Sequence, residues 1–279
     1  MIDTHAHLDF ENFEEDREEV ISRAFDNGVK KIINIGVDLE TSKKSIALAE
    51  QHENIFAAVG FHPHDAEEIL NSPSDDDFEE LKKLAKHKKV VAIGEIGLDY
   101  SRFGDTHQIE KQKELLLKQL KMASELNLPV VIHCREAWGD LFDIISNFKF
   151  QISNFQLHCY SGGTEDTEKF LKLSNVCFSF SGNITYPKPA SRSDKLAEAV
   201  RRVPLDRIML DSDSPYLAPQ AMRGKRNEPI YIRYIAEKIA EIKEISVEEV
   251  EKMTDENAER FFGLSTNTTN RNMDTTKNI

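Results

Sequence analysis

The chain has 279 residues, of which 39% are hydrophobic, so it is long enough to bury one sizeable core. Its formal net charge of −13 argues against a protein that coats nucleic acid through a general basic face, but it allows an enzyme that handles phosphate locally. Three cysteines are too few for a disulfide framework, which indicates a reducing compartment.

The N-terminal segment carries no sign of export. It begins Met1-Ile2-Asp3-Thr4-His5, without a basic region or a following apolar run, so no signal peptide is predicted. No window approaches the roughly 18 apolar residues of a membrane-spanning helix. We therefore expect a cytoplasmic protein without membrane contact, and we infer no stable protein partner.

Short apolar runs alternate with longer amphipathic segments from end to end. The runs are rich in Val, Ile and Phe and largely continuous, which is typical of strands buried on both faces, as in a parallel sheet. In chain order, the eight runs are residues 1–7, 30–37, 55–60, 90–97, 129–134, 154–159, 176–180 and 207–211.

Helical periodicity is clearest in three of the intervening segments. Residues 106–126 and 229–245 repeat apolar side chains at three- and four-residue spacing, and Pro229 suits the first turn of the second segment. A further helix is expected over residues 247–262, where Gly263 would end it.

A strand followed by a helix, repeated eight times, predicts the α/β class and a closed (β/α)8 TIM barrel. An open doubly wound sheet is the alternative topology. We expect residues 1–263 to form this single domain. Residues 264–279 are mainly polar, with many Thr and Asn, so a disordered tail is expected there.

Histidines collect at the ends of the predicted strands. Two His-x-His pairs occur where random placement of nine histidines would give about 0.3. His5 and His7 share one face of the first strand, because residues two apart on a strand point the same way. His62, His133 and His158 follow or end three further apolar runs. Core histidines have no reason to choose the same end of several strands, whereas the active site of a barrel lies at that end.

Carboxylates follow the same pattern. Glu95 lies inside an apolar run, where a carboxylate is costly unless it is paired or bound to metal, and Asp213 follows the eighth run. Together with four of the histidines, these residues form a predicted two-metal set: His5, His7, Glu95, His133, His158 and Asp213. Imidazole and carboxylate ligands suit two divalent ions such as Mg, Mn or Zn.

The predicted chemistry explains these residue types. One carboxylate can bridge two ions, and the ions lower the pKa of water so that hydroxide exists near neutral pH. A second carboxylate can then accept the proton. We expect Glu95 and Asp213 to be catalytic as well as metal-binding, with Asp213 as the general base.

Six motifs extend this pattern, in order, along the chain. They are DTHAHLD at 3–9, GFHPH at 60–64, GEIGLDY at 94–100, HCR at 133–135, HCYSG at 158–162 and DSDSPYL at 211–217. Together they resemble the TatD-type metal-dependent deoxyribonucleases of the amidohydrolase superfamily. The resemblance spans residues 1–263.

The resemblance implies a division of the ligands. The positions of His5, His7 and Asp213 would hold one ion, those of His133 and His158 the other, and that of Glu95 would bridge them. The implied activity is metal-dependent hydrolysis of DNA phosphodiesters, often as a 3′–5′ exonuclease. We therefore expect DNA as the substrate, single-stranded or at its 3′ ends.

One position departs from the family pattern. The family often has Glu where this chain has Asp211. The shorter side chain keeps the charge but loses reach, which leaves open the contact that it makes.

A basic loop follows the last predicted strand. Arg223, Lys225 and Arg226 stand out on a chain of charge −13, and the loop after the last strand of a barrel commonly binds phosphate. We expect these residues, with His62 and Arg135, to bind the substrate around the scissile bond. The alternative is a solvated run of charge.

Two other functions are compatible with the same residues. A hydrolase of another ester or amide, such as an aminoacyl ester on tRNA, would use the same activated water. A metal-binding interaction protein without turnover is the alternative from another class, and the complete ligand set argues against it. The basic loop favours a phosphate-bearing substrate without separating DNA from RNA or tRNA.

Overall fold

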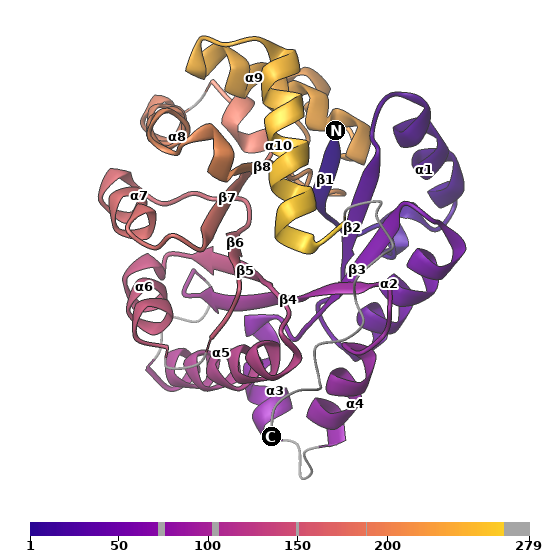
Figure 1. Ribbon diagram of the computed structural model, residues 1–279, viewed down its shortest axis with the longest axis vertical. Helices are drawn as coiled ribbons and strands as arrows, with labels where there is room; N and C mark the ends of the chain where they lie inside the picture. The colour runs from indigo at the N-terminus through magenta and orange to yellow at the C-terminus, as the bar shows by residue number, and fades with distance from the viewer. Residues whose placement is uncertain (72–75, 102–105, 149–150, 188, 265–279) are drawn as a thin grey trace, which may run out of the picture.

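The computed structural model describes residues 1–71, 76–101, 106–148, 151–187 and 189–264. Eight strands form one sheet in sequential order, and every neighbouring pair is parallel (Figure 1). The strands are β1 (Ile2–Ala6), β2 (Lys31–Ile35), β3 (Ile55–Val59), β4 (Val90–Asp99), β5 (Val130–Arg135), β6 (Phe155–Leu157), β7 (Val176–Phe180) and β8 (Ile208–Leu210).

The sheet closes between the first strand and the segment after the last. Ala6 and Ser214 form a parallel bridge, the amide of Asp213 donates to the His5 carbonyl at 2.9 Å, and the amide of His7 donates to the Ser214 carbonyl at 2.8 Å. The protein is therefore a single-domain (β/α)8 TIM barrel, as predicted, and the open sheet is excluded.

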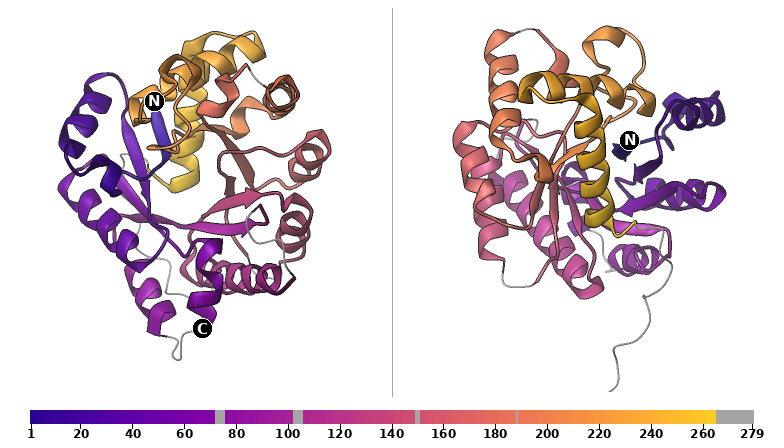
Figure 2. Two further views of the ribbon diagram at one scale, coloured as in Figure 1. Left: turned by 180° about the vertical axis from the view of Figure 1, so that it is seen from behind. Right: turned by 45° about the horizontal axis from the view of Figure 1, so that its top comes forward.

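Helices form the outer layer around the strands (Figure 2). The α-helices are α1 (Arg17–Asp26), α2 (Leu39–Gln51), α3 (Ala66–Asn71), α4 (Asp76–Leu84), α5 (Thr106–Leu126), α6 (Trp138–Asn147), α7 (Thr164–Leu171), α8 (Ala190–Arg202), α9 (Ile232–Lys243) and α10 (Val247–Phe262). Short 3-10 turns are η1 (Glu11–Phe13), η2 (Pro63–Asp65), η3 (Gly182–Thr185), η4 (Leu205–Arg207), η5 (Gln220–Met222) and η6 (Pro229–Tyr231).

The three helices predicted from periodicity are present. α5 and α10 have the expected bounds, and Gly263 ends α10 in the left-handed conformation with φ 66°. The segment from Pro229 differs, because it opens with the turn η6 before α9 begins. None of the helices in the described ranges is both long and apolar enough to cross a membrane.

The apolar core has two parts. The larger one lies between the strands and the surrounding helices, and the smaller one fills the inside of the barrel under α10. The smaller cluster joins Ile33, Val131 and Met209 of the strands to Phe261 and Phe262 of α10. α10 therefore covers the amino ends of the strands.

The start of the expected tail needs correction. Leu264 is buried in the inner cluster, and its carbonyl accepts a hydrogen bond from the Lys31 ammonium at 2.9 Å. Leu264, the last described residue, therefore belongs to the packed barrel. The rest of the predicted tail, residues 265–279, lies outside the described residues.

Candidate metal centre

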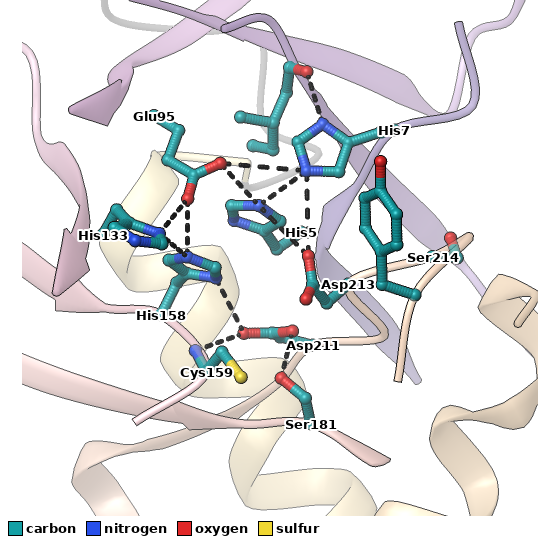
Figure 3. Close-up of polar contacts among 12 residues, drawn as sticks. His5, His7, Glu95, His133, His158, Cys159, Ser181, Asp211, Asp213 and Ser214 are labelled. Atoms are coloured by element: carbon teal, nitrogen blue, oxygen red, sulfur yellow. Dashed lines mark hydrogen bonds and ion pairs between the residues drawn. The ribbon is translucent and has the colours of Figure 1, made fainter. Parts of the chain in front are cut away.

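A cluster of histidines and carboxylates lies at the carboxyl ends of the strands, opposite α10 (Figure 3). Two-residue steps along the strands place it there. On β5, Val131 belongs to the inner apolar cluster, and His133 comes two residues later on the same face. Met209 and Asp211 repeat this step on β8 and just beyond it. β5 and β8 therefore each place an apolar residue in the inner cluster and a polar residue of the site two positions later.

His5 and His7 point their Nε2 atoms at each other over 3.2 Å. The Nδ1 of His7 lies 3.0 Å from the Ile35 carbonyl. Because a carbonyl can only accept, this Nδ1 carries the hydrogen, and the Nε2 of neutral His7 keeps its lone pair. The Oδ1 of Asp213 lies 3.9 Å from the His5 Nε2 and 3.7 Å from the His7 Nε2.

The Glu95 carboxylate lies between two groups of histidines. Its Oε2 faces the first group, at 3.4 Å from the His5 Nε2 and 3.8 Å from the His7 Nε2. Its Oε1 faces the second group, at 2.7 Å from both the His133 Nδ1 and the His158 Nε2. One carboxylate therefore serves two groups of possible ligands.

Local structure in β4 brings Glu95 close to β5. Gly97 has φ +152°, and a Cβ there would lie 1.8 Å from the His133 carbonyl oxygen. Only glycine fits this approach without moving one of the strands. The glycine therefore allows the neighbouring strands to meet where Glu95 and His133 make contact.

A second carboxylate on the same strand supports His133. The Asp99 Oδ2 lies 3.2 Å from the His133 Nε2 and 3.0 Å from the His64 Nε2. We did not predict this role from the sequence, although Glu95 and Asp99 stand four residues apart on one strand. That spacing alone places them on the same face.

The electrostatics of the cluster favour positive charge beside Glu95. Burial opposes ionisation of this carboxyl, but His158 and hydrogen bonds from three histidines outweigh it and hold the pKa of Glu95 well below its usual value. Burial also disfavours the charged form of His158, yet Glu95 and Asp211 raise the pKa of His158 well above its usual value. The charge can be carried by a proton on His158 or by a cation.

Two other histidines of the cluster, His5 and His62, favour the neutral form. Burial lowers the pKa of His5 to about 4 and that of His62 to about 3. Neutral imidazole is the form that binds metal. These two rings are therefore available as ligands near neutral pH without losing a proton first.

Asp213 has a different environment from the other carboxylates. Burial, together with the charges of Asp211 and Glu95, raises the pKa of Asp213 to about 8. Its side chain keeps 15% of its surface exposed, so the group can exchange protons with solvent. The residue itself adopts a left-handed conformation with φ 52°, beyond the end of β8.

The contacts of Asp211 show what the shorter side chain does in this chain. Its carboxylate accepts hydrogen bonds from the Cys159 amide at 2.8 Å and from the hydroxyls of Ser179 and Ser181 at 2.7 Å each. Its Oδ2 also lies 3.7 Å from the His158 Nδ1. Asp211 therefore ties the segment after β6 to β7 and lies beneath His158.

The donor atoms fit divalent metal ions. Three groups each bring their ligand atoms within 4.8 Å of one another. They are His5 with His7 and Asp213, His5 with Glu95 and His158, and His62 with Glu95 and His133. Nitrogen and oxygen donors of this kind suit Zn, Mn or Mg. The fixed His7 tautomer, with its lone pair turned into the cluster, has the arrangement expected of a ligand.

The residues expected to bind substrate are more scattered. The Nε2 of His62 lies 3.9 Å from the Glu95 Oε1, so His62 borders the cluster. Arg135 is exposed at the end of β5, and Lys225 is exposed in the loop after β8. The Arg223 guanidinium stacks over the Tyr186 ring at 4.4 Å from its centroid. Their predicted contacts with substrate remain predictions.

Arg226 has partners within the protein instead. Its guanidinium donates to both carboxylate oxygens of Asp16 at 2.7 Å and to the Asn12 carbonyl at 2.6 Å, and it lies over the Phe13 ring. A phosphate would have to displace this bidentate ion pair. The structure therefore shows that Arg226 attaches the loop to η1 and the start of α1. Its predicted contact with substrate remains a prediction.

Comparison with known proteins agrees with this geometry. Residues 2–263 match the family described as TatD related DNase. The chain is 39% identical to the "Uncharacterized metal-dependent hydrolase YabD" of Bacillus subtilis, over 95% of this chain and 100% of that protein. It is 34% identical to the "3'-5' ssDNA/RNA exonuclease TatD" of Pantoea ananatis, over 95% and 100% of the two chains.

Solved structures of TatD homologues are also similar to this chain. The chain is similar to the crystal structure of YJJV, a TatD homolog from Escherichia coli, with a TM-score of 0.84 and 32% identity. The match covers 94% of this chain and 98% of the YJJV chain. A TatD family hydrolase from Entamoeba histolytica has a TM-score of 0.81 at 26% identity, with coverage of 94% and 97%. The cluster at the carboxyl ends of the strands is thus the candidate centre of a metal-dependent enzyme, and the chain belongs to the TatD family of metal-dependent hydrolases.

Proposed function

We propose that this hydrolase cleaves phosphodiester bonds of DNA and releases nucleotides from the 3′ end of single strands. The observation that carries the proposal is the position of Glu95, whose two carboxylate oxygens face two separate groups of histidines. Hydrolases that act through two metal ions use a shared site of this kind on phosphate esters. Relatives named as 3′–5′ exonucleases of single-stranded DNA and RNA support the choice of substrate.

The ligands divide between the two sides of Glu95. His5, His7 and Asp213 would hold one divalent ion, and His133 and His158 the other. Bound there, the ions would supply Lewis acidity, which lowers the pKa of water and stabilises charge on a phosphoryl oxygen. Asp99 keeps the His133 ring in place through its contact with Nε2.

Asp213 is the candidate general base. A pKa raised to about 8 gives its carboxylate a high affinity for a proton near neutral pH. The side chain borders His5 and His7 and also reaches solvent. It can therefore take a proton from the attacking water and release it outside the site.

Substrate phosphates would meet Arg223 and Lys225 in the loop after β8, together with Arg135 at the end of β5 and His62 after β3. The loop keeps its place because Arg226 is paired with Asp16. Since the body of the protein carries a net charge of −13, attraction of a polyanion has to be local. We expect few phosphate contacts and a shallow dependence of KM on salt.

The test is a screen of metal-reconstituted protein against single-stranded DNA, RNA, a simple phosphodiester and carboxyl esters, including an aminoacyl-tRNA. The proposal expects stepwise release of nucleotides from 3′ ends, abolished in Asp213→Asn protein whose thermal unfolding is unchanged. Turnover of carboxyl esters alone would replace it with the aminoacyl-ester alternative. No turnover with any substrate in fully metallated protein would overturn it.

A further inference from the structure

One exposed aromatic side chain stands beside the metal centre. Within the described ranges, two large hydrophobic side chains are exposed, Leu117 at 44% and Tyr216 at 52%. Leu117 lies on the outer helix α5, whereas Tyr216 follows the candidate base Asp213 by three residues. At the edge of a site, an accessible aromatic ring offers a flat face on which a planar part of a ligand can stack.

The backbone of Tyr216 is held from several sides. Its amide donates to the Asp213 carbonyl at 2.8 Å, and its carbonyl accepts from the Asn227 side chain at 2.6 Å. The same Asn227 amide group donates to the Ser212 carbonyl at 2.6 Å. Asn227 is fully buried, so the loop is fastened from within while the ring of Tyr216 remains accessible.

A second aromatic ring lies next to it. Phe10, in the loop after β1, stacks on His7 with centroids 4.6 Å apart and planes 18° apart. The Tyr216 ring meets Phe10 edge-on at 6.4 Å and His7 at 6.5 Å. Asp213 and Glu95 add to burial in raising the pKa of the Tyr216 phenol, which agrees with its place beside the centre. The two loops therefore form an aromatic wall on the His7 side of the cluster.

We propose that Tyr216, supported by Phe10, is the stacking surface for a nucleobase next to the scissile phosphodiester. The inference rests on the proposed function and adds to it the part of the substrate that is recognised. Every base has a flat π-face, so a single aromatic ring can hold any of the four without reading the sequence. Stacking also needs no positive charge, which suits a protein whose overall charge of −13 repels the sugar-phosphate backbone.

The experiment uses short single strands in which one nucleotide beside the scissile bond is abasic. One substrate lacks the 3′-terminal base, another lacks the preceding base, and a third is complete. Tyr216→Ala is expected to raise KM on the complete strand about tenfold, with kcat nearly unchanged, because a base stacked on an aromatic side chain loses its partner. On one of the two abasic strands, Tyr216→Ala and the unchanged protein should have the same KM, because the base that stacks on Tyr216 is missing from that strand.

Two further variants separate stacking from other roles. Tyr216→Phe keeps the ring and loses the hydroxyl, so it should retain the low KM if the ring acts by stacking. Leu117→Ala removes the other exposed apolar side chain, which lies on the outer helix α5, and should leave KM and kcat unchanged on all three strands. Equal losses for Tyr216→Ala on the complete and both abasic strands would overturn the proposal, as would a loss in Tyr216→Phe equal to that in Tyr216→Ala.

A readout that needs no turnover separates this inference from the proposed function. The probe is a DNA strand with phosphorothioate linkages, which slow hydrolysis. It carries 5-iodo-2′-deoxyuridine at the position where removal of the base abolishes the effect of Tyr216→Ala. The strand is irradiated with the protein, and cross-linked peptides are identified by mass spectrometry. Cross-links at Tyr216 or Phe10 support stacking even if DNA is not hydrolysed. Hydrolysis of DNA with cross-links only elsewhere overturns the stacking surface and leaves the proposed function standing. Ribonucleotide versions of both probes show whether RNA uses the same surface.

Discussion

The two ends of the barrel are built from the same strands but have opposite chemistry. At the amino end, Phe261 and Phe262 of α10 fill the interior with apolar surface, and charges at the edge are paired, as in the 2.7 Å contact of Lys31 with Glu259. At the carboxyl end, His133 and Asp213 belong to a cluster of ionisable groups. There the carboxylate of Asp213 lies near the like charges of Asp211 and Glu95. Two residues along a strand separate one environment from the other.

The two ends of the barrel therefore contribute to different properties, the amino end to stability and the carboxyl end to activity. The amino end is packed and paired, which stabilises the barrel, whereas the carboxyl end holds groups that favour binding of cations over stability. Substitutions at the two ends are therefore expected to change different measurements. Each prediction below tests that separation, from the largest expected effect to the smallest.

The largest effect is expected at Asp213. Asp213→Asn keeps the shape of the side chain but cannot accept a proton, and a general base contributes about 10²–10⁴-fold to the rate. We expect a loss of that size in kcat, with the free energy of unfolding unchanged or slightly raised, because the charges of Asp211 and Glu95 no longer repel a third carboxylate. Steady-state kinetics and denaturant unfolding on the same preparation measure both. More than roughly a tenth of the original rate would show that another group is the base.

At the opposite end, Phe261→Ala should act on stability instead. The side chain is buried in the inner cluster, and truncation of a buried Phe costs about 3–5 kcal/mol in free energy of unfolding. Metal content and kcat at temperatures well below unfolding should stay within twofold of the unchanged protein. A fall in bound metal that matched the loss of stability would mean that the two ends are coupled.

The next effect concerns Asp99, which contacts the predicted metal ligand His133 and orients its ring. Asp99→Asn weakens the contact that orients His133, and such changes typically reduce metal affinity about 10–100-fold. Competition with a chelator indicator measures the affinity. Asp140→Asn is a matched control, because Asp140 pairs with Tyr100 and Lys113 rather than with the metal ligands. Equal affinities for the two variants would contradict the role of Asp99.

The smallest effect is expected for the ion pair at the amino end. The Glu259 side chain is 41% exposed, so its pair with Lys31 is screened by solvent and contributes at most about 1 kcal/mol. Glu259→Gln should therefore lower the free energy of unfolding by less than about 1 kcal/mol and leave activity alone. A larger loss would show that the pair and the Leu264 carbonyl, which Lys31 also contacts, act as one unit.

Much of the fold was predictable because buried parallel strands appear as continuous apolar runs. Each of the eight runs coincides with a strand, although β4 and β5 extend one or two residues beyond the predicted ends. α5 and α10 have the predicted bounds, since local periodicity reports a buried helix face. The predicted ligands also come together, because strands of a barrel bring their carboxyl ends to one face. Their roles as ligands remain predictions.

The rest depended on contacts that local patterns do not encode. Arg226 appears in the sequence as a free cation in a basic loop, but its partner Asp16 stands 210 residues away. Leu264 looks like part of a polar tail, yet it packs on the barrel through a contact with Lys31. Asp99 and Tyr216 stood within recognised motifs, and only their neighbours in space indicate what they do.

The most direct test of the central claim is the number of ions that the chain binds at saturation. Glu95 faces two groups of ligands, so equilibrium dialysis against Mn²⁺ or Zn²⁺, followed by elemental analysis, should give two ions per chain. His133→Ala, which removes a ligand from one side of Glu95, should reduce this to one. Saturation of the unchanged protein at a single ion per chain would contradict a centre shared by two ions.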